Sequence, residues 1–171
     1  MPQYNTATEQ EKDRARAEYE GYLHDLSTFP ASMTINGVSI RGFGPDLFTP
    51  ISQQTVEQED KHFLHTTTVL SYREFEDLIF TIESYYYPDY AAFDWTIYYE
   101  NTSSSENTPI IEDILAADMQ MQGAKPYLLT NKGDAGRYAA EEFSLEGKKR
   151  IYAPTTGRST QGAYPYYNLE Y

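Results

Sequence analysis

Cysteine is absent from the 171-residue chain, which excludes disulfide frameworks, thiolate metal sites and cysteine nucleophiles. No apolar run approaches the ~20 residues that a helix needs to cross a bilayer. Basic residues are scarce as well, with 13 Lys and Arg against 26 Asp and Glu and a net charge of −13. A chain with this balance has no broad surface for neutralising phosphates. We therefore expect neither nucleic acid nor an anionic membrane among its partners.

The first residues contain no basic stretch followed by an apolar one, so the sequence predicts no secretory signal and the cytoplasm as the default location. Tryptophan occurs once, but 17 Tyr and 8 Phe make the chain rich in aromatic residues, which favour strands. The length suits one domain. We expect an N-terminal helical segment over residues 1–28, followed by a β-sandwich over residues 29–171.

One helix is predicted over residues 5–22. Thr8 and Glu11 have the spacing of a capping box, in which each side chain satisfies a free backbone N–H of the other residue. Gly21 stands where a glycine commonly ends a helix. The charged surface of this segment indicates a solvated helix at the edge of the domain.

From Phe29 onward, short alternating runs bounded by turn residues indicate antiparallel strands. The clearest runs are residues 62–72, 78–87 and 93–100. In the last of these, alternation places Trp95 on one face with Phe93, Ile97 and Tyr99. We expect that face, and Trp95 with it, to belong to the core.

A polar loop over residues 101–109 is expected to join this strand to the run 110–119 as a hairpin. The run itself fits both helical spacing and the alternation of a strand, so its pattern leaves the two open. Residues 123–136 and 155–162 are predicted to be loops around short strands at 142–145 and 149–153.

No motif predicts an active site or a cofactor. His62 and His65 would point to opposite faces of a strand, so a shared metal ion is disfavoured. Gly42-Phe43-Gly44 is followed by Pro45, which predicts a bend rather than a phosphate-binding turn. The adjacent acids at 112–113 and 141–142 cannot face each other across a glycosidic bond. We expect no catalytic residue, no metal site and no cofactor in this chain.

The C-terminal residues 157–171 combine an arginine, an asparagine and several tyrosines. Flat aromatic faces beside planar polar groups suit sugar rings, whose C–H faces stack while their hydroxyls need paired donors and acceptors. Packing in a β core is the commoner role of such tyrosines.

Three stretches of the chain resemble the N-terminal domain of glycoside hydrolase family 36 α-galactosidases, the melibiase-like group. Residues 85–102 are similar to a family passage in which a Tyr-Pro-Asp-like turn leads to an acid-Trp strand and an Asn-Thr turn, and residues 108–114 continue it. Residues 153–170 are similar to the family's Ala-Pro-x-Gly-Gly-Arg-x-x-Asn-Gly-Ala-x-Pro-Tyr-Phe-Asn-Leu-Glu, with Thr156 and Gln161 as departures. Residues 29–37 match a family strand more loosely.

The resemblance implies an all-β, mainly antiparallel β-supersandwich with a short N-terminal helix, incomplete at the C-terminus. In the family a (β/α)₈ barrel follows this domain and supplies both catalytic Asp residues of a retaining mechanism. Such a barrel takes ~250 residues, so we expect the chain to be a fragment. The resemblance also favours a strand for the run 110–119, and an unpaired sheet edge would invite self-association.

We therefore expect a non-catalytic domain of an α-galactosidase-type enzyme, inactive by itself, with the missing barrel, α-galactosides and further copies of the chain as partners. The alternatives are a stand-alone carbohydrate-binding module and a structural oligomerisation domain. The resemblance places the residues expected to support a sugar site or a domain junction in its strongest segment: Arg158, Tyr164, Tyr166 and Asn168.

Overall fold

The computed structural model describes residues 7–58, 62–119, 127–133, 139–151 and 163–170. The chain divides into two compact units, Met1–Met119 and Gln120–Tyr171. Within these described ranges, every strand pair is antiparallel and one α-helix precedes the strands. The all-β fold class expected from the sequence is confirmed.

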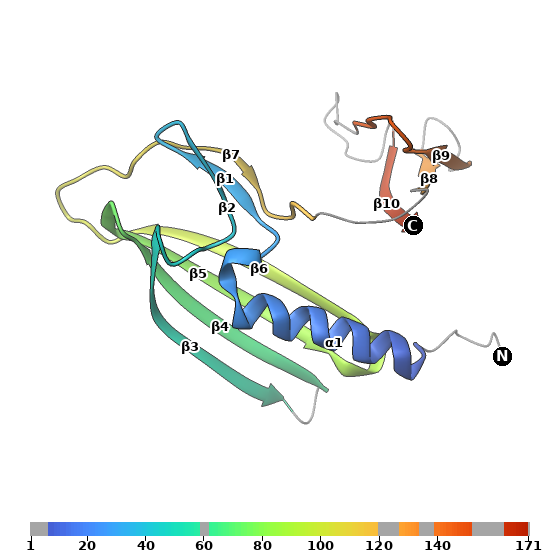
Figure 1. Ribbon diagram of the computed structural model, residues 1–171, viewed down its shortest axis with the longest axis horizontal. Coiled ribbons are helices and arrows are strands. Elements are labelled where there is room, and N and C mark those ends of the chain that lie inside the picture. The colour runs from blue at the N-terminus through green and yellow to red at the C-terminus, as the bar shows by residue number, and fades with distance from the viewer. Residues whose placement is uncertain (1–6, 59–61, 120–126, 134–138, 152–162, 171) are drawn as a thin grey trace. The chain divides into compact units, whose positions relative to one another are not determined.

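Helix α1 spans Glu9–His24 and begins at the predicted capping box (Figure 1). The backbone N–H of Thr8 donates to Glu11 Oε2 at 2.7 Å, and the backbone N–H of Glu11 donates to Thr8 Oγ1 at 3.3 Å. The expected stop at Gly21 is wrong, because the helix continues to His24. Asp25 ends it by donating its backbone N–H to the Gly21 carbonyl at 3.0 Å. An interior glycine costs about 1 kcal/mol relative to alanine, which a helix packed against a sheet tolerates.

The smaller sheet of the first unit has the order β2-β1-β7, with β1 over Ser32–Ile35, β2 over Val38–Arg41 and β7 over Ile111–Leu115. Asn36 and Gly37, both with positive φ, form the two-residue turn between β1 and β2. Asn-Gly is the pair that this type of hairpin turn prefers. The strand expected for the run that starts at Ile110 is confirmed as β7.

The larger sheet is a four-stranded meander in the order β3-β4-β5-β6. Its strands are β3 over Phe48–Gln58, β4 over Phe63–Tyr72, β5 over Phe75–Tyr87 and β6 over Ala92–Asn101. The short 3₁₀ helix η2, Pro88–Tyr90, joins β5 to β6. Three of these strands confirm the predicted runs to within about three residues.

The predicted hairpin between residues 93–100 and the run 110–119 is wrong. β7 pairs with β1 of the smaller sheet, and β6 pairs with β5. The polar loop therefore crosses from one sheet to the other (Figure 1). The nine residues between β6 and β7, 102–110, are long enough for this crossing, whereas a tight turn is not.

The two sheets bury one core between them. Met33, Ile35 and Ile40 of the smaller sheet share a hydrophobic cluster with Phe80 and Ile82 of the larger one. Trp95, Ile97 and Tyr99 pack against this cluster as partly buried side chains. The face of β6 assigned to the core from alternation is therefore correct.

Helix α1 covers the remaining part of the inner face of the larger sheet. The ring of Tyr19 stacks on that of Tyr86, with centroids 5.5 Å apart, and its hydroxyl donates to Thr66 Oγ1 at 2.9 Å. Ala15 and Tyr86 complete this small buried cluster. The helix therefore packs on the sheet through the face that carries Ala15 and Tyr19, and its charged residues remain in contact with solvent.

Gly42 lies in the predicted bend, where the chain passes close to the 3₁₀ helix η1, Leu26–Thr28. Its φ is +63°, and a Cβ atom there would lie 2.2 Å from the Ser27 carbonyl oxygen. Its N–H donates to the Ala31 carbonyl at 2.8 Å. Both the backbone conformation and the lack of space require glycine at this position.

The second unit contains a sheet of order β10-β8-β9, with β8 over Tyr127–Lys132, β9 over Ala140–Ser144 and β10 over Ala163–Glu170. β8 lies within residues 123–136, which were expected to form a loop. The strand predicted at 142–145 is confirmed in β9, two residues earlier. Residues 149–151 form no strand, and residues 152–153 lie outside the described part of the chain. These runs are short and contain both polar and apolar residues, so their own pattern does not identify the strands. Hydrogen bonding to neighbouring strands determines which of them become strands.

Among the residues with described positions, no helix is long and apolar enough to cross a membrane.

Candidate functional site

The four residues expected from the family resemblance fall at the end of the second unit. Arg158 lies outside the described residues, whereas Tyr164, Tyr166 and Asn168 belong to β10. Asn168 pairs with Leu129 of β8 and is exposed. The register of β10 against β8 shifts between Ala163 and Tyr167. Whether these residues support a sugar site or a domain junction stays a prediction.

A different surface gathers chemistry-bearing side chains: the outer face of the larger sheet, which points away from α1 and from the smaller sheet. Alternation and the cross-strand register place the following residues on it: Ser52, Gln54, Val56, Gln58, Phe63, His65, Thr67, Val69, Ser71, Ile79, Thr81, Glu83, Tyr85, Tyr87, Ala92, Asp94, Thr96, Tyr98 and Glu100. No Lys or Arg occurs in the four strands. Among the residues named here, the charges are the carboxylates of Glu83, Asp94 and Glu100, and His65 is the one basic side chain.

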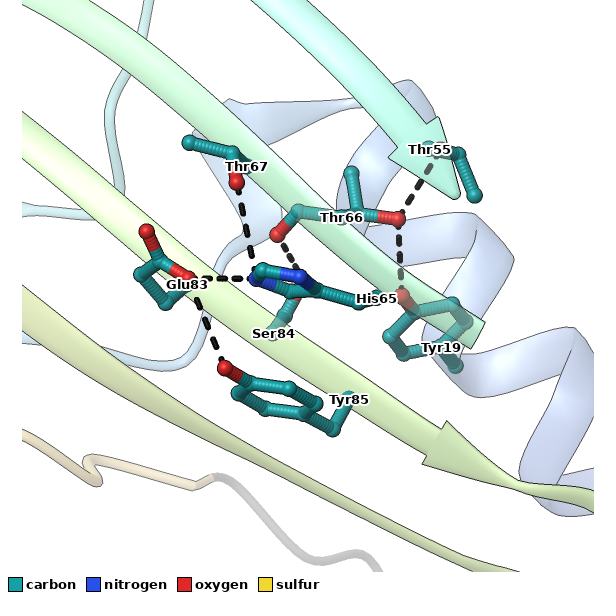
Figure 2. A network of polar contacts seen from close by, with 8 residues as sticks. All are labelled: Tyr19, Thr55, His65, Thr66, Thr67, Glu83, Ser84 and Tyr85. Atoms are coloured by element: carbon teal, nitrogen blue, oxygen red, sulfur yellow. Dashed lines mark hydrogen bonds and ion pairs between the residues drawn. The ribbon is translucent and has the colours of Figure 1, made fainter. Parts of the chain in front are cut away.

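His65 of β4 and Glu83 of β5 lie side by side on this face (Figure 2). His65 Nε2 bonds to Glu83 Oε2, and Thr67 Oγ1 lies 3.5 Å from the same nitrogen. The imidazole stacks on the ring of Tyr85, its cross-strand partner, with centroids 4.4 Å apart and planes 4° apart. The Tyr85 hydroxyl lies 3.5 Å from Glu83 Oε2. Each of these side chains is therefore held in position by the others.

Two further aromatic rings extend the cluster. Phe63 contacts Tyr85 and Tyr87 edge to face, with centroid distances of 5.6 and 6.1 Å. The Tyr87 hydroxyl donates to Asp94 Oδ2 at 3.0 Å. An open depression of about 440 Å³ adjoins Phe63 at this end of the sheet, beside Pro88.

The tyrosine hydroxyls of the cluster stay protonated at neutral pH. Partial burial raises the pKa of Tyr85, and the nearby Glu83 carboxylate raises it further. Partial burial also raises the pKa of Tyr87, and its hydrogen bond to Asp94 adds to this increase. The Tyr85 hydroxyl therefore donates to Glu83 and the Tyr87 hydroxyl to Asp94. The other lone pairs of these two carboxylates remain able to accept hydrogen bonds.

Directly behind this cluster, the inner side of the same strands carries a structural network. Thr66 Oγ1 bonds to both Tyr19 and Thr55, at 2.9 Å each, and the Ser84 hydroxyl donates to the Thr66 carbonyl (Figure 2). Thr66 and Ser84 are buried. This network fixes β3, β4, β5 and α1 together, so the outer cluster rests on a rigid support.

A hollow of about 400 Å³ lies at one end of the sandwich. It is lined by Asn36, Tyr72, Glu74, Phe75 and residues 106–110 of the crossing loop. The Tyr72 hydroxyl donates to Glu74 at 3.1 Å, and Asn36 Oδ1 accepts from the backbone N–H of Ile110 at 3.0 Å. Two pairs of polar groups in this hollow are thus engaged with each other.

The arrangement of the outer face favours binding over catalysis. It combines fixed acceptors, hydroxyls and aromatic rings on a surface formed by strands. In the described part of the chain, no group of three or more His, Cys, Asp or Glu side chains could hold a metal ion. His62 precedes β4 with a φ of +52° and lies near Asp89, so it does not join His65.

Sequence reasoning did not find the His65–Glu83 cluster. Alternation in the sequence predicts that His65 and Thr67 share one face of their strand and that Glu83 and Tyr85 share one face of theirs. What joins the two pairs is the register between β4 and β5, in which His65 pairs with Tyr85 and Thr67 with Glu83.

Comparison of the chain with protein-family models, curated proteins and solved structures finds no match.

Proposed function

We propose that this chain is a non-catalytic β-sandwich domain of an α-galactosidase-type glycoside hydrolase that acts on α-galactosides. In this proposal a (β/α)₈ barrel supplies the catalytic residues, and the sandwich supports folding, assembly and the rim of the sugar site. One observation carries the proposal. Residues 85–102, one of the resembling stretches, form a continuous structural passage from the end of β5 through η2 to the whole of β6.

Local structure supports the role of each motif in that stretch. Pro88 opens η2, and Ala91 leaves it with a φ of +49°, so the Tyr-Pro-Asp sequence makes a tight connection. Trp95 packs between the two sheets and donates Nε1–H to the Ala116 carbonyl at 2.7 Å. Asn101 accepts from the backbone N–H of Ser103 at 2.9 Å and so starts the crossing loop. These are structural roles, as expected of a domain that contains no catalytic residues.

The proposal is tested by activity on p-nitrophenyl α-galactoside. The isolated chain should give no turnover above buffer, because retaining cleavage needs two carboxyl groups about 5 Å apart in a pocket. A chimera in which this chain replaces the N-terminal sandwich of a family 36 enzyme should be active. Hydrolysis by the isolated chain, lost on mutating one acid, would contradict the proposal, and so would an insoluble or inactive chimera.

The C-terminal residues receive a separate test in the active chimera. Alanine substitutions at Arg158, Tyr164, Tyr166 and Asn168 should raise KM or weaken assembly. Glu141 and Glu142 of β9 serve as controls on the same unit. Equal, negligible effects at all six positions would exclude these residues from the sugar site and the junction.

A further inference from the structure

The outer face of the larger sheet has a composition unlike that of an ordinary solvated surface. Soluble domains usually mix charges of both signs over about 25–35% of their surface. Here the described strands contain no Lys or Arg, and hydroxyl and amide side chains predominate. On the edge strand β6, the outward residues Asp94, Thr96, Tyr98 and Glu100 are all exposed. The face is therefore rich in neutral hydrogen-bonding groups and accessible to a ligand.

Two of its carboxylates, those of Glu83 and Asp94, are oriented before any ligand arrives. His65 and Tyr85 contact Glu83, while Tyr87 holds Asp94. A carboxylate accepts several hydrogen bonds, and those from O–H groups are short and strong. Orientation by neighbouring side chains lowers the entropy lost when a ligand binds. The face thus presents fixed acceptors for hydroxyl donors.

Aromatic rings lie among these acceptors. Phe63, Tyr85 and Tyr87 form one edge-to-face group, and Tyr98 stands apart from them with 56% of its surface exposed. Tyr98 follows Asp94 by four positions in β6, and at about 3.3 Å per residue the two side chains are about 13 Å apart along the strand. The aromatic and acceptor groups therefore extend over the length of a short oligosaccharide.

We propose that this face binds a neutral oligosaccharide laid over β4, β5 and β6. Sugar hydroxyls would donate to Glu83 and Asp94, and a sugar C–H face would pack on Tyr98. A neutral polyhydroxylated ligand matches a face that combines acceptors, hydroxyls and aromatic surface. An anionic ligand is disfavoured, because His65 is the one basic side chain on the face and already contacts Glu83. Binding at this face does not rest on the proposed α-galactosidase function.

The test is calorimetric titration of the full chain with cellohexaose, mannohexaose and maltohexaose, together with a hexagalacturonate and hexalysine. At least one neutral hexasaccharide should bind, and the hexagalacturonate should not. Amide chemical shifts should change along β4, β5 and β6. Tyr98→Ala and Glu83→Gln should each weaken binding about fivefold to tenfold, as expected for the loss of one aromatic contact or one charged acceptor.

Two matched variants outside the outer face test whether the loss of binding is specific to that face. Tyr90→Ala removes an exposed tyrosine of η2 outside the outer face, and Glu18→Gln removes an exposed acid of α1. Both should leave the Kd within twofold, and circular dichroism should show that all four variants are folded. The inference is overturned if no neutral hexasaccharide binds at millimolar concentration, or if the face variants bind like wild type. It is also overturned if hexalysine alone binds through Glu83, since the face would then serve a cationic partner. None of these outcomes depends on α-galactosidase activity.

Discussion

Trp95 links the aromatic part of the core to the segment that follows β7. Its ring packs edge to face on Phe29 at 5.5 Å and stacks on Phe93 at 5.9 Å. Its indole N–H satisfies the Ala116 carbonyl at 2.7 Å. The residue therefore stabilises the sandwich through both apolar contact and a hydrogen bond between distant parts of the chain.

We predict that Trp95→Ala lowers the free energy of unfolding by about 3 kcal/mol, the lower end of the range for a buried tryptophan, because the ring is only partly buried. Urea denaturation followed by circular dichroism measures this change. Tyr98→Ala on the exposed side of the same strand should change stability by less than about 0.5 kcal/mol. A folded Trp95→Ala variant of wild-type stability would show that the ring is not part of the core.

Gly42 is the second residue on which the fold depends. Gly42→Ala should lower the free energy of unfolding by more than about 2 kcal/mol, since a side chain is strained at positive φ and its Cβ would meet the Ser27 carbonyl. Gly37→Ala is the control, with a φ of +79° and nothing within 4 Å of the added Cβ. It carries only the conformational penalty of about 1 kcal/mol. Equal losses in thermal or urea unfolding would mean that the close contact at Gly42 relaxes.

At the scale of elements, the N-terminus of α1 gives the protein a defined pH dependence. The backbone N–H of Thr8, and next its hydroxyl, hold the pKa of Glu11 below its ordinary value of 4.5. A carboxyl group with a lowered pKa in the folded state stabilises the fold above its unfolded pKa. This contribution is lost as the pH falls through the folded value.

We therefore predict that Glu11→Gln is less stable than wild type at neutral pH, and that the difference shrinks as the pH falls below 4.5 and is lost below the folded pKa of Glu11. Thermal unfolding at a series of pH values measures it. Thr8→Ala should lower the free energy of unfolding by about 1 kcal/mol through loss of the cap. A difference between wild type and Glu11→Gln that does not change with pH would exclude the capping box as its source.

For the whole molecule, the division into two units makes a separate prediction. Both hydrophobic clusters and both sheets of the sandwich lie within Met1–Met119. A fragment ending at Met119 should therefore fold alone and unfold cooperatively. Its amide resonances for β3 to β6 should match those of the full chain. Loss of the near-ultraviolet circular dichroism signal in the fragment would show that the second unit is needed for the packing of the first.

Several features follow from the sequence alone, because they depend on neighbouring residues. The capping box needs only Thr8 and Glu11, the bend at Gly42 only its local residues, and the core side of β6 only its alternation. The all-β class follows from aromatic content and alternating runs. Local propensity and period 2 are sufficient for these predictions.

Other features were decided by contacts between distant residues. Alternation predicts that β6 and β7 are strands, but it does not show that they lie in different sheets. The loop between them crosses because β7 pairs with β1. Gly21 does not end α1, since packing of Tyr19 on the sheet and the cap at Asp25 carry the helix further.

The His65–Glu83 cluster belongs to this second group. His65 and Glu83 are 18 positions apart, and they meet because a register of β4 against β5 sets Thr67 opposite Glu83 and His65 opposite Tyr85. A shift of one residue would turn these side chains to the buried face. The sequence determines which side of each strand is polar, and only the tertiary structure determines which polar groups of different strands lie side by side.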